Sequence, residues 1–139
     1  MKLIKNSDNF YTLSFAPGEE VVSKLAKFAK ENGIGAGHVT GLGACGKLRL
    51  GYYNLDTKEY EEKVFEERLE ILSLVGNVSL SPKGKEFVHV HGVFGRSDFS
   101  TIGGHVKELV VSGAGEVHIR AFPEPMRRTR DEQTGLNLL

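Results

Sequence analysis

The chain has 139 residues, of which 40% are hydrophobic and 26% are charged, a composition typical of one globular domain and not of a disordered chain. Its 18 basic and 18 acidic side chains give a formal net charge of +0, so no overall field attracts a polyanion such as DNA. No apolar run reaches the roughly 20 residues of a membrane-spanning helix, and the first residues lack the apolar core of a secretion signal. The sole cysteine excludes an internal disulfide. We therefore expect a single cytoplasmic domain that spans residues 1–139.

One segment, from Pro17 to Asn32, has the pattern of a helix. Its apolar residues recur at the three- and four-residue spacing of a helix with one buried face. Pro17, Glu19 and Glu20 suit a helix start, where proline is tolerated and negative charge is favoured. Gly33 is a typical residue at a helix end. The charged face of this helix is expected to be ordinary solvated surface.

The remaining patterned segments are typical of β-strands. A polar stretch, Asn54 to Lys58, predicts a hairpin turn between two of them. Many strands with one main helix predict an α+β fold with a largely antiparallel, barrel-like sheet. The predicted strands are Phe10–Phe15, His38–Leu42, Leu48–Tyr53, Tyr60–Glu66, Leu69–Leu80, Phe87–Phe94 and Leu109–Phe122.

Glycines are frequent in the run from Gly41 to Gly46. A phosphate-binding loop would need a helix directly after such glycines, but the residues that follow alternate like a strand. The glycines are therefore interpreted as turns, bulges or places where two backbones approach closely. Cys45, inside this run, is expected to be a small buried side chain and not a nucleophile.

The histidines give the sharpest chemical pattern. His89 and His91 lie two residues apart, so on a strand they share one face with Cα atoms roughly 6.5 Å apart. His105 follows two glycines, after a connection long enough to return the chain beside the first strand. Three imidazoles with an open fourth position are the arrangement of a catalytic zinc site. The alternative is that these are surface or hydrogen-bonded histidines, which is also the interpretation favoured for the isolated His38 and His118.

Charge is distributed unevenly along the chain. Residues 56–70 hold seven acidic side chains against three basic ones, whereas residues 120–130 hold four arginines against one glutamate. Solvated strand faces and tails commonly produce such asymmetry.

Several motifs occur in the order seen in the PPC family, the plants-and-prokaryotes-conserved domain, which the chain resembles from end to end. They are Gly41-Leu42-Gly43, the run Leu69 to Asn77, Phe87-Val88-His89-Val90-His91-Gly92, Gly103-Gly104-His105 and the closing run Asp131 to Leu139.

The resemblance implies an α+β fold, commonly a homotrimer, in which the residues matching His89, His91 and His105 bind one metal ion per chain, usually taken as zinc. Plant members join the domain to DNA-binding AT-hooks, but this chain has no Gly-Arg-Pro core. Its nearest basic cluster is Arg127-Arg128-Thr129-Arg130. The fold also resembles that of acetolactate decarboxylase, a zinc enzyme with three histidine ligands, although fold alone does not fix function.

Two functions follow as hypotheses. The first is a stand-alone prokaryotic-type PPC protein, a metal-binding homotrimer with a regulatory or weak DNA-binding role. Its apolar runs Leu69–Val75 and Leu109–Val111 would form either a subunit interface or the core of a monomer. The alternative is a zinc-dependent lyase or hydrolase of a small molecule. Glu70 would then be the base or a carboxylate behind the ligands, and Arg49 would bind an acidic substrate, unless both form structural salt bridges.

Overall fold

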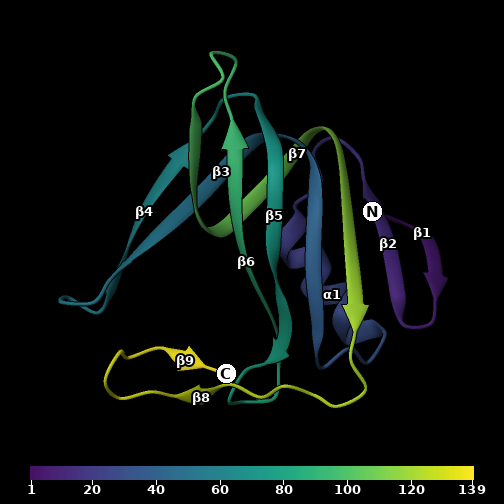
Figure 1. The fold of residues 1–139 in the computed structure, drawn as a ribbon, viewed down its shortest axis with the longest axis vertical. Helices are drawn as coiled ribbons and strands as arrows, with labels where there is room; N and C mark the ends of the chain where they lie inside the picture. Colours follow the sequence, from purple (N-terminus) through teal and green to yellow (C-terminus); the bar gives the residue numbers. More distant parts are fainter.

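Figure 1 shows the fold of residues 1–139 in a computed structural model, in which strands dominate and a single helix occurs. The predicted α+β class is thereby confirmed. The elements in chain order are β1 (Lys2–Ser7), β2 (Phe10–Phe15), α1 (Val21–Glu31), β3 (Gly37–Asn54), β4 (Glu59–Phe65), β5 (Leu69–Leu80), β6 (Glu86–Gly95), β7 (Thr101–Ala121), β8 (Thr129–Arg130) and β9 (Asn137–Leu138).

The main sheet is antiparallel and closes on itself. Its seven strands lie in the order β1-β2-β7-β6-β5-β3-β4, and β3 also pairs with β7. Strands β3, β5, β6 and β7 therefore form a ring, while β2 with β1 extends from β7 and β4 extends from β3. The prediction of a largely antiparallel sheet is confirmed, and its closure is a ring of four strands and not a full barrel.

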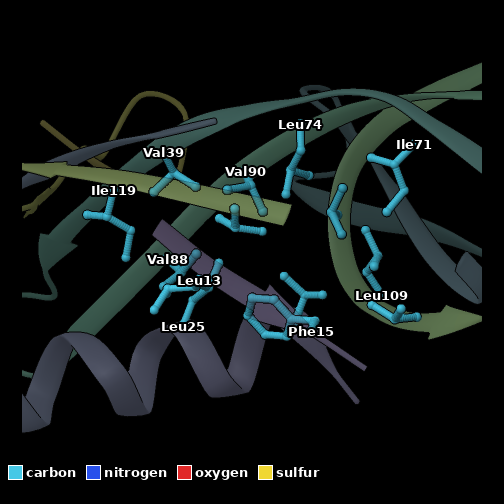
Figure 2. Packing of buried hydrophobic residues seen from close by; sticks show 14 of the residues in the cluster. Leu13, Phe15, Leu25, Val39, Ile71, Leu74, Val88, Val90, Leu109 and Ile119 are labelled. Carbon is cyan, nitrogen blue, oxygen red and sulfur yellow. The ribbon is translucent and has the colours of Figure 1, made fainter. Parts of the chain in front are cut away.

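The hydrophobic core lies within this sheet and against the helix. Alternate residues of β6 point inward, so that Val88, Val90 and Phe94 are buried. Figure 2 shows Leu25 of α1 beside Val88 and close to Leu13 of β2. Burial of such side chains contributes about 1.5–3 kcal/mol each. The helix thus covers one side of the core.

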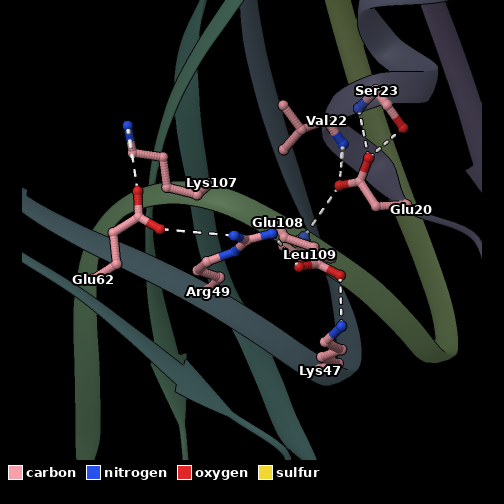
Figure 3. Close-up of polar contacts among 9 residues, drawn as sticks. All are labelled: Glu20, Val22, Ser23, Lys47, Arg49, Glu62, Lys107, Glu108 and Leu109. Carbon is pink, nitrogen blue, oxygen red and sulfur yellow. Dashed lines mark hydrogen bonds and ion pairs between the residues drawn. The ribbon is translucent and has the colours of Figure 1, made fainter. Parts of the chain in front are cut away.

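The helix begins four residues later than the sequence pattern indicates. The Glu20 carboxylate accepts hydrogen bonds from the backbone N–H groups of Val22 and Ser23, at 2.9 and 2.7 Å, and caps the first turn. The same carboxylate accepts a bond from the Leu109 N–H at 3.2 Å, as Figure 3 shows, and joins the helix start to β7. Pro17 lies in the turn before the helix.

Two long strands were predicted only in part. The predicted strands His38–Leu42 and Leu48–Tyr53 are one continuous strand, β3, because its glycines form a bulge and not a turn. Gly43 has a φ of +141°, and a Cβ there would overlap the backbone of Ala114 in β7, so a glycine is needed. Strand β7 likewise begins at Thr101, ahead of the predicted Leu109.

The last residues form a tail that carries the short β8–β9 hairpin. This hairpin lies at the lower end of the molecule in Figure 1, beneath the ring. The Tyr53 hydroxyl donates to the Thr134 carbonyl at 2.6 Å, and the Lys58 ammonium donates to the Glu132 carbonyl at 3.1 Å. The tail is therefore tied to the β3–β4 hairpin. Helix α1 lacks the length and apolar character needed to cross a membrane.

Candidate metal centre and the adjoining cavity

Three histidines meet on the outer face of β6 and β7. His89 and His91 point outward from β6, in alternation with the buried Val88 and Val90, as their spacing predicted. His105 of β7 is the direct register partner of His91. Opposite residues of an antiparallel pair project to the same side of the sheet, so the return of the chain brings the third imidazole to the other two.

The spacing of the imidazoles suits one metal ion. Each ring offers a nitrogen, and these three atoms lie within 4.8 Å of one another. The Nε2 atoms of His89 and His91 are 3.2 Å apart. Two ligands at about 2.0–2.1 Å from a tetrahedral zinc ion would lie about 3.3 Å apart. The cluster could therefore hold a metal with little rearrangement of these two side chains.

His105 also carries an unsatisfied polar atom. Its residue is 9% exposed, and its Nδ1 is buried without a hydrogen-bond partner. A buried polar atom without a partner costs about 1–3 kcal/mol, a cost that ligand bonding or a reoriented ring would remove. Imidazole nitrogen is a preferred ligand of zinc and other transition metals. The three imidazoles and the unpartnered Nδ1 of His105 thus fit a bound metal.

Burial keeps two of the three imidazoles neutral. Desolvation lowers the pKa of His89 to about 4, with a further contribution from the nearby Arg128 guanidinium. Desolvation also lowers the pKa of His105 to about 4, and the charge of Lys107 contributes next. Neutral imidazole is the form that binds metals, so both rings are ready for ligation at neutral pH.

Arg128 reaches the histidines from the C-terminal tail. It is only 5% exposed, and its guanidinium donates to the Ser79 hydroxyl at 2.9 Å and to the Asn77 side-chain oxygen at 2.9 Å. It also donates to the Asn137 carbonyl at 3.0 Å and lies 3.3 Å from Nδ1 of His89. In the sequence Arg128 stands out only as part of the basic cluster Arg127-Arg128-Thr129-Arg130, whereas in the structure it is buried beside the candidate site.

Behind His89, the neighbouring strand carries a glycine for a steric reason. Gly76 of β5 lies next to the register position of His89, and a Cβ there would overlap the carbonyl oxygen of His89 and the backbone of Val90. The two strands can approach at this point only because residue 76 has no side chain.

His105 also adjoins a chain of aromatic and charged contacts. The Tyr60 ring is 5.3 Å from the His105 ring, and the Lys107 ammonium lies 3.5 Å from the centre of the Tyr60 ring. Lys107 is 4.0 Å from Glu62, which is 3.7 Å from Arg49. Figure 3 shows Glu62 between these two cations.

Arg49 belongs to this outer chain of contacts and does not line the cavity beside the histidines. It pairs with Glu108 at 2.7 Å, and Glu108 also pairs with Lys47 at 2.9 Å. Arg49 therefore forms a salt bridge, the predicted alternative to binding an acidic substrate.

Glu70 is placed away from the histidines. It is exposed on β5, paired in register with Ala44 and Gly95, and lines a different cavity with Arg68 and Arg96. The structure therefore brings neither Glu70 nor Arg49 to the imidazoles.

The three remaining residues weighed in the sequence, His38, Cys45 and His118, lie outside the histidine cluster. His118 Nδ1 lies 3.1 Å from the Thr12 hydroxyl, and its ring stacks on Phe10. His38 is exposed. Cys45 is buried, and burial raises the pKa of its thiol to about 11, which makes it a poor nucleophile.

A cavity of about 380 Å³ adjoins the histidine cluster. The alternation of β7 could have placed Lys107, two residues after His105, on the same side of the strand as that histidine. The C-terminal tail has no periodic pattern that would have predicted the position of its residues at the cavity. The lining consists of Val22, Tyr60, Phe87, Val88, His89, His105, Val106, Lys107, Arg128, Leu136, Asn137 and Leu138.

Residues 3–123 match the family model of the Plants and Prokaryotes Conserved (PCC) domain. The chain belongs to this family. Its PCC domain holds all three histidines, whereas Arg128 and the β8–β9 hairpin lie beyond the matched residues.

Crystal structures of similar proteins share the fold. A candidate DNA-binding protein from Bacteroides thetaiotaomicron is 38% identical, with a TM-score of 0.92 over 96% of this chain and 93% of that chain. A metal-containing protein from Archaeoglobus fulgidus is 36% identical, with a TM-score of 0.87 over 99% of this chain and 98% of the other. Acetolactate decarboxylase from Bacillus subtilis, at 16% identity and a TM-score of 0.54 over 91% of this chain and 58% of that one, shows a likeness of fold alone.

A curated relative, the bifunctional protein GlmU of Synechococcus sp. strain JA-3-3Ab, is 32% identical over 124 residues. The match covers 83% of this chain but only 19% of that protein. The chain thus spans about a fifth of the length of the curated relatives it matches.

Proposed function

We propose that this PCC-domain protein is a metal-binding homotrimeric module in which His89, His91 and His105 each give one nitrogen to a single zinc ion per chain. The observation that carries the proposal is the 3.2 Å separation of the His89 and His91 Nε2 atoms beside the buried, unpartnered Nδ1 of His105. The 36% identical metal-containing protein from Archaeoglobus fulgidus supports it.

The trimer is supported by apolar side chains left on the outside of β5 and β6. Leu72, Val75 and Val93 are 55%, 47% and 44% exposed. Ser73 and Val93 are register partners, as are Val75 and His91, so the exposed residues of the two strands share one face at the edge of the histidine cluster. Covering such a face with a second copy of the chain would remove it from water.

A regulatory or weak DNA-binding role is supported by the candidate DNA-binding protein from Bacteroides thetaiotaomicron, which is 38% identical. The formal net charge of +0 argues that any contact with DNA is local and weak.

A second candidate function, a zinc-dependent lyase or hydrolase, is favoured by one observation. The cavity of about 380 Å³ is lined by His89 and His105, so a small molecule inside it would lie against the metal site. When bound, zinc would supply a Lewis acid or an activated water. Lys107 and Arg128 would orient a substrate from the same cavity, and burial would keep the two histidines neutral.

The metal assignment is tested by elemental analysis of protein purified without added metal. Wild type is expected to contain about one zinc per chain, and the triple variant His89→Ala, His91→Ala, His105→Ala to contain none. His38→Ala, which removes an exposed histidine outside the cluster, is the matched control and should retain the metal. Equal metal content in wild type and triple variant would refute the site.

The homotrimer is tested separately by analytical ultracentrifugation at micromolar concentration. A mass near three times 15.3 kDa is expected. Val75→Asp places a charge on the exposed apolar face and should shift the population toward monomer, whereas Leu55→Asp, which alters an exposed residue of the β3–β4 turn, should not. A monomeric wild type would contradict this part of the proposal.

A further inference from the structure

The guanidinium of Arg128 is buried without an acidic partner. All its hydrogen-bond partners are neutral: the Ser79 hydroxyl, the Asn77 side-chain oxygen, the Asn137 carbonyl and the His89 ring nitrogen. Arginine has five N–H donors, so these four bonds leave one Nη1–H group available. Buried charges in proteins are normally paired with an opposite charge, because the loss of hydration is otherwise uncompensated.

A second cation lines the same cavity. The Lys107 ammonium rests on the face of the Tyr60 ring, 3.5 Å from its centre. Its nearest carboxylate, Glu62, is 4.0 Å away and is shared with Arg49. Lys107 is therefore only weakly neutralised within the protein.

The cavity wall supplies no negative charge. Neither aspartate nor glutamate is among the lining residues, so Arg128 and Lys107 give this space an uncompensated positive potential. A divalent ion on the histidines would add to that potential, and this part alone of the inference rests on the proposed function.

Most of the remaining lining is apolar, the exceptions being His89, His105 and Asn137. Phe87 lies with its ring 5.0 Å from the Arg128 guanidinium carbon, and Leu136 and Leu138 of the tail line the cavity beside it. A ligand that uses the whole cavity would therefore combine an anionic end with an apolar body.

We propose that the cavity between the histidine cluster and the C-terminal tail binds a small organic carboxylate, whose charged group lies between Lys107 and Arg128 and whose apolar part lies against Phe87, Leu136 and Leu138. Lys107 is held by Tyr60, Arg128 by Asn77 and Ser79, so both cations are positioned before the ligand arrives.

The test is a titration of the ¹⁵N-labelled protein, followed by NMR at constant ionic strength, with three probes. Hexanoate has both the charge and the apolar body, hexanamide has the body without the charge, and acetate has the charge without the body. Each probe is added to metal-free and to zinc-loaded protein. Hexanoate is expected to bind at least tenfold more tightly than either of the others in both forms, with shifts centred on the amides of Lys107 and Leu138.

Lys107→Met, which keeps the length of the side chain and removes its charge, should weaken hexanoate binding at least fivefold and leave hexanamide unchanged. Lys27→Met is the matched control, since Lys27 lies exposed on α1 with its side chain 73% accessible. Arg128→Lys, which keeps a positive charge in the tail, should retain the preference for hexanoate over hexanamide.

Three results would overturn the inference: no binding of hexanoate, equal binding of hexanoate and hexanamide, or an unchanged hexanoate affinity in Lys107→Met. A preference for hexanoate over hexanamide that is found only in zinc-loaded protein would also overturn the inference, because the metal and not the two side chains would then select the anion. If metal-free protein selects hexanoate but no zinc binds, the anion site stands and the proposed metal function fails.

Discussion

Nη2 of Arg128 lies 3.3 Å from Nδ1 of His89, on the part of the ring that faces away from His91. A guanidinium can only donate a hydrogen bond, so this contact favours a neutral His89 whose proton is on Nε2. Ligation of a metal through Nε2 requires the other tautomer, with the proton on Nδ1 facing Arg128. The tail and a bound metal would therefore favour opposite tautomers of the same imidazole.

This opposition predicts the effects of Arg128→Met. The variant removes a positive charge and a competing donor from beside His89, so zinc affinity should rise about tenfold. It also leaves Asn77 and Ser79 without their partner, which should lower the free energy of unfolding of the metal-free protein by about 1–3 kcal/mol. Calorimetric zinc titration and chemical denaturation measure the two effects.

Arg127→Met is the control for Arg128→Met, because Arg127 is the neighbouring residue of the tail and is exposed. Arg127→Met should change neither the zinc affinity nor the free energy of unfolding by more than the experimental error. A fall in zinc affinity in Arg128→Met would show that the guanidinium supports ligation and would contradict the proposed opposition.

A second prediction concerns the unpartnered Nδ1 of His105. Replacing a buried, unsatisfied polar group by an apolar one of similar size is close to neutral or stabilising. His105→Leu should therefore leave the metal-free protein as stable as wild type, or more stable by up to about 1 kcal/mol, while zinc binding is lost. Thermal unfolding with and without zinc separates the two results.

The control for His105→Leu is His118→Leu, which removes a histidine that contacts the Thr12 hydroxyl. It should retain zinc and lose the free energy of that hydrogen bond, about 0.5–1.5 kcal/mol. A large loss of metal-free stability in His105→Leu would instead mean that the ring is needed for packing.

The third prediction is the pH dependence of the metal-free protein. Burial lowers the pKa of His89 and His105 to about 4, below the ordinary histidine value of 6.5. Between these values the unfolded chain binds more protons than the folded one, so the free energy of unfolding falls as pH decreases from about 6.5 to 4. Urea denaturation at pH 7, 5.5 and 4 measures the decline.

The double variant His89→Gln, His105→Gln should show a shallower decline over the same interval. The Glu19 carboxyl, whose pKa is lowered to about 2 mainly by its hydrogen bond from Lys24, acts in a separate interval below pH 4.5. If the free energy of unfolding falls equally steeply from about pH 6.5 to 4 in wild type and in the double variant, the decline in that interval does not come from these histidines.

The fourth prediction is that DNA binding is weak and without sequence preference. Of the arginines in the basic cluster, Arg128 is buried beside His89 and only Arg127 and Arg130 are exposed. A duplex titration at about 150 mM salt should give dissociation constants in the micromolar range or weaker for both random and A·T-rich sequences. Nanomolar, sequence-selective binding would restore the DNA-binding role in full.

How far the sequence predicts this molecule depends on the kind of signal. The alternation of β6 placed His89 and His91 on one face, and the glycines before His105 indicated the close return of β7. The limits of β5, Leu69 to Leu80, were predicted as observed, because the apolar run is bounded by polar residues and Pro82. Such signals are local and periodic, so the sequence displays them directly.

The rest depends on contacts between distant segments. Strand β1 has exposed residues throughout and therefore no apolar alternation to reveal it. Glu20 was expected to favour the helix start through its charge, but its role as cap and as acceptor from Leu109 requires β7 beside it. The burial of Arg128 follows from the path of the tail, which no periodic pattern fixes. Glu70 was placed on the correct strand but at the end remote from the histidines.

The pairing of β3 with β7 has a consequence for synthesis of the chain. The ring closes only when β7, which ends at Ala121, is available to β3, and such non-local pairing is slow to form. His105 and then Arg128 emerge from the ribosome after most of the ring strands. A nascent chain thus presents His89 and His91 alone, as a loose two-nitrogen chelate, and acquires its third imidazole and its opposing guanidinium last. If the proposed metal binds through all three imidazoles, its loading is expected only after β7 has paired with β6.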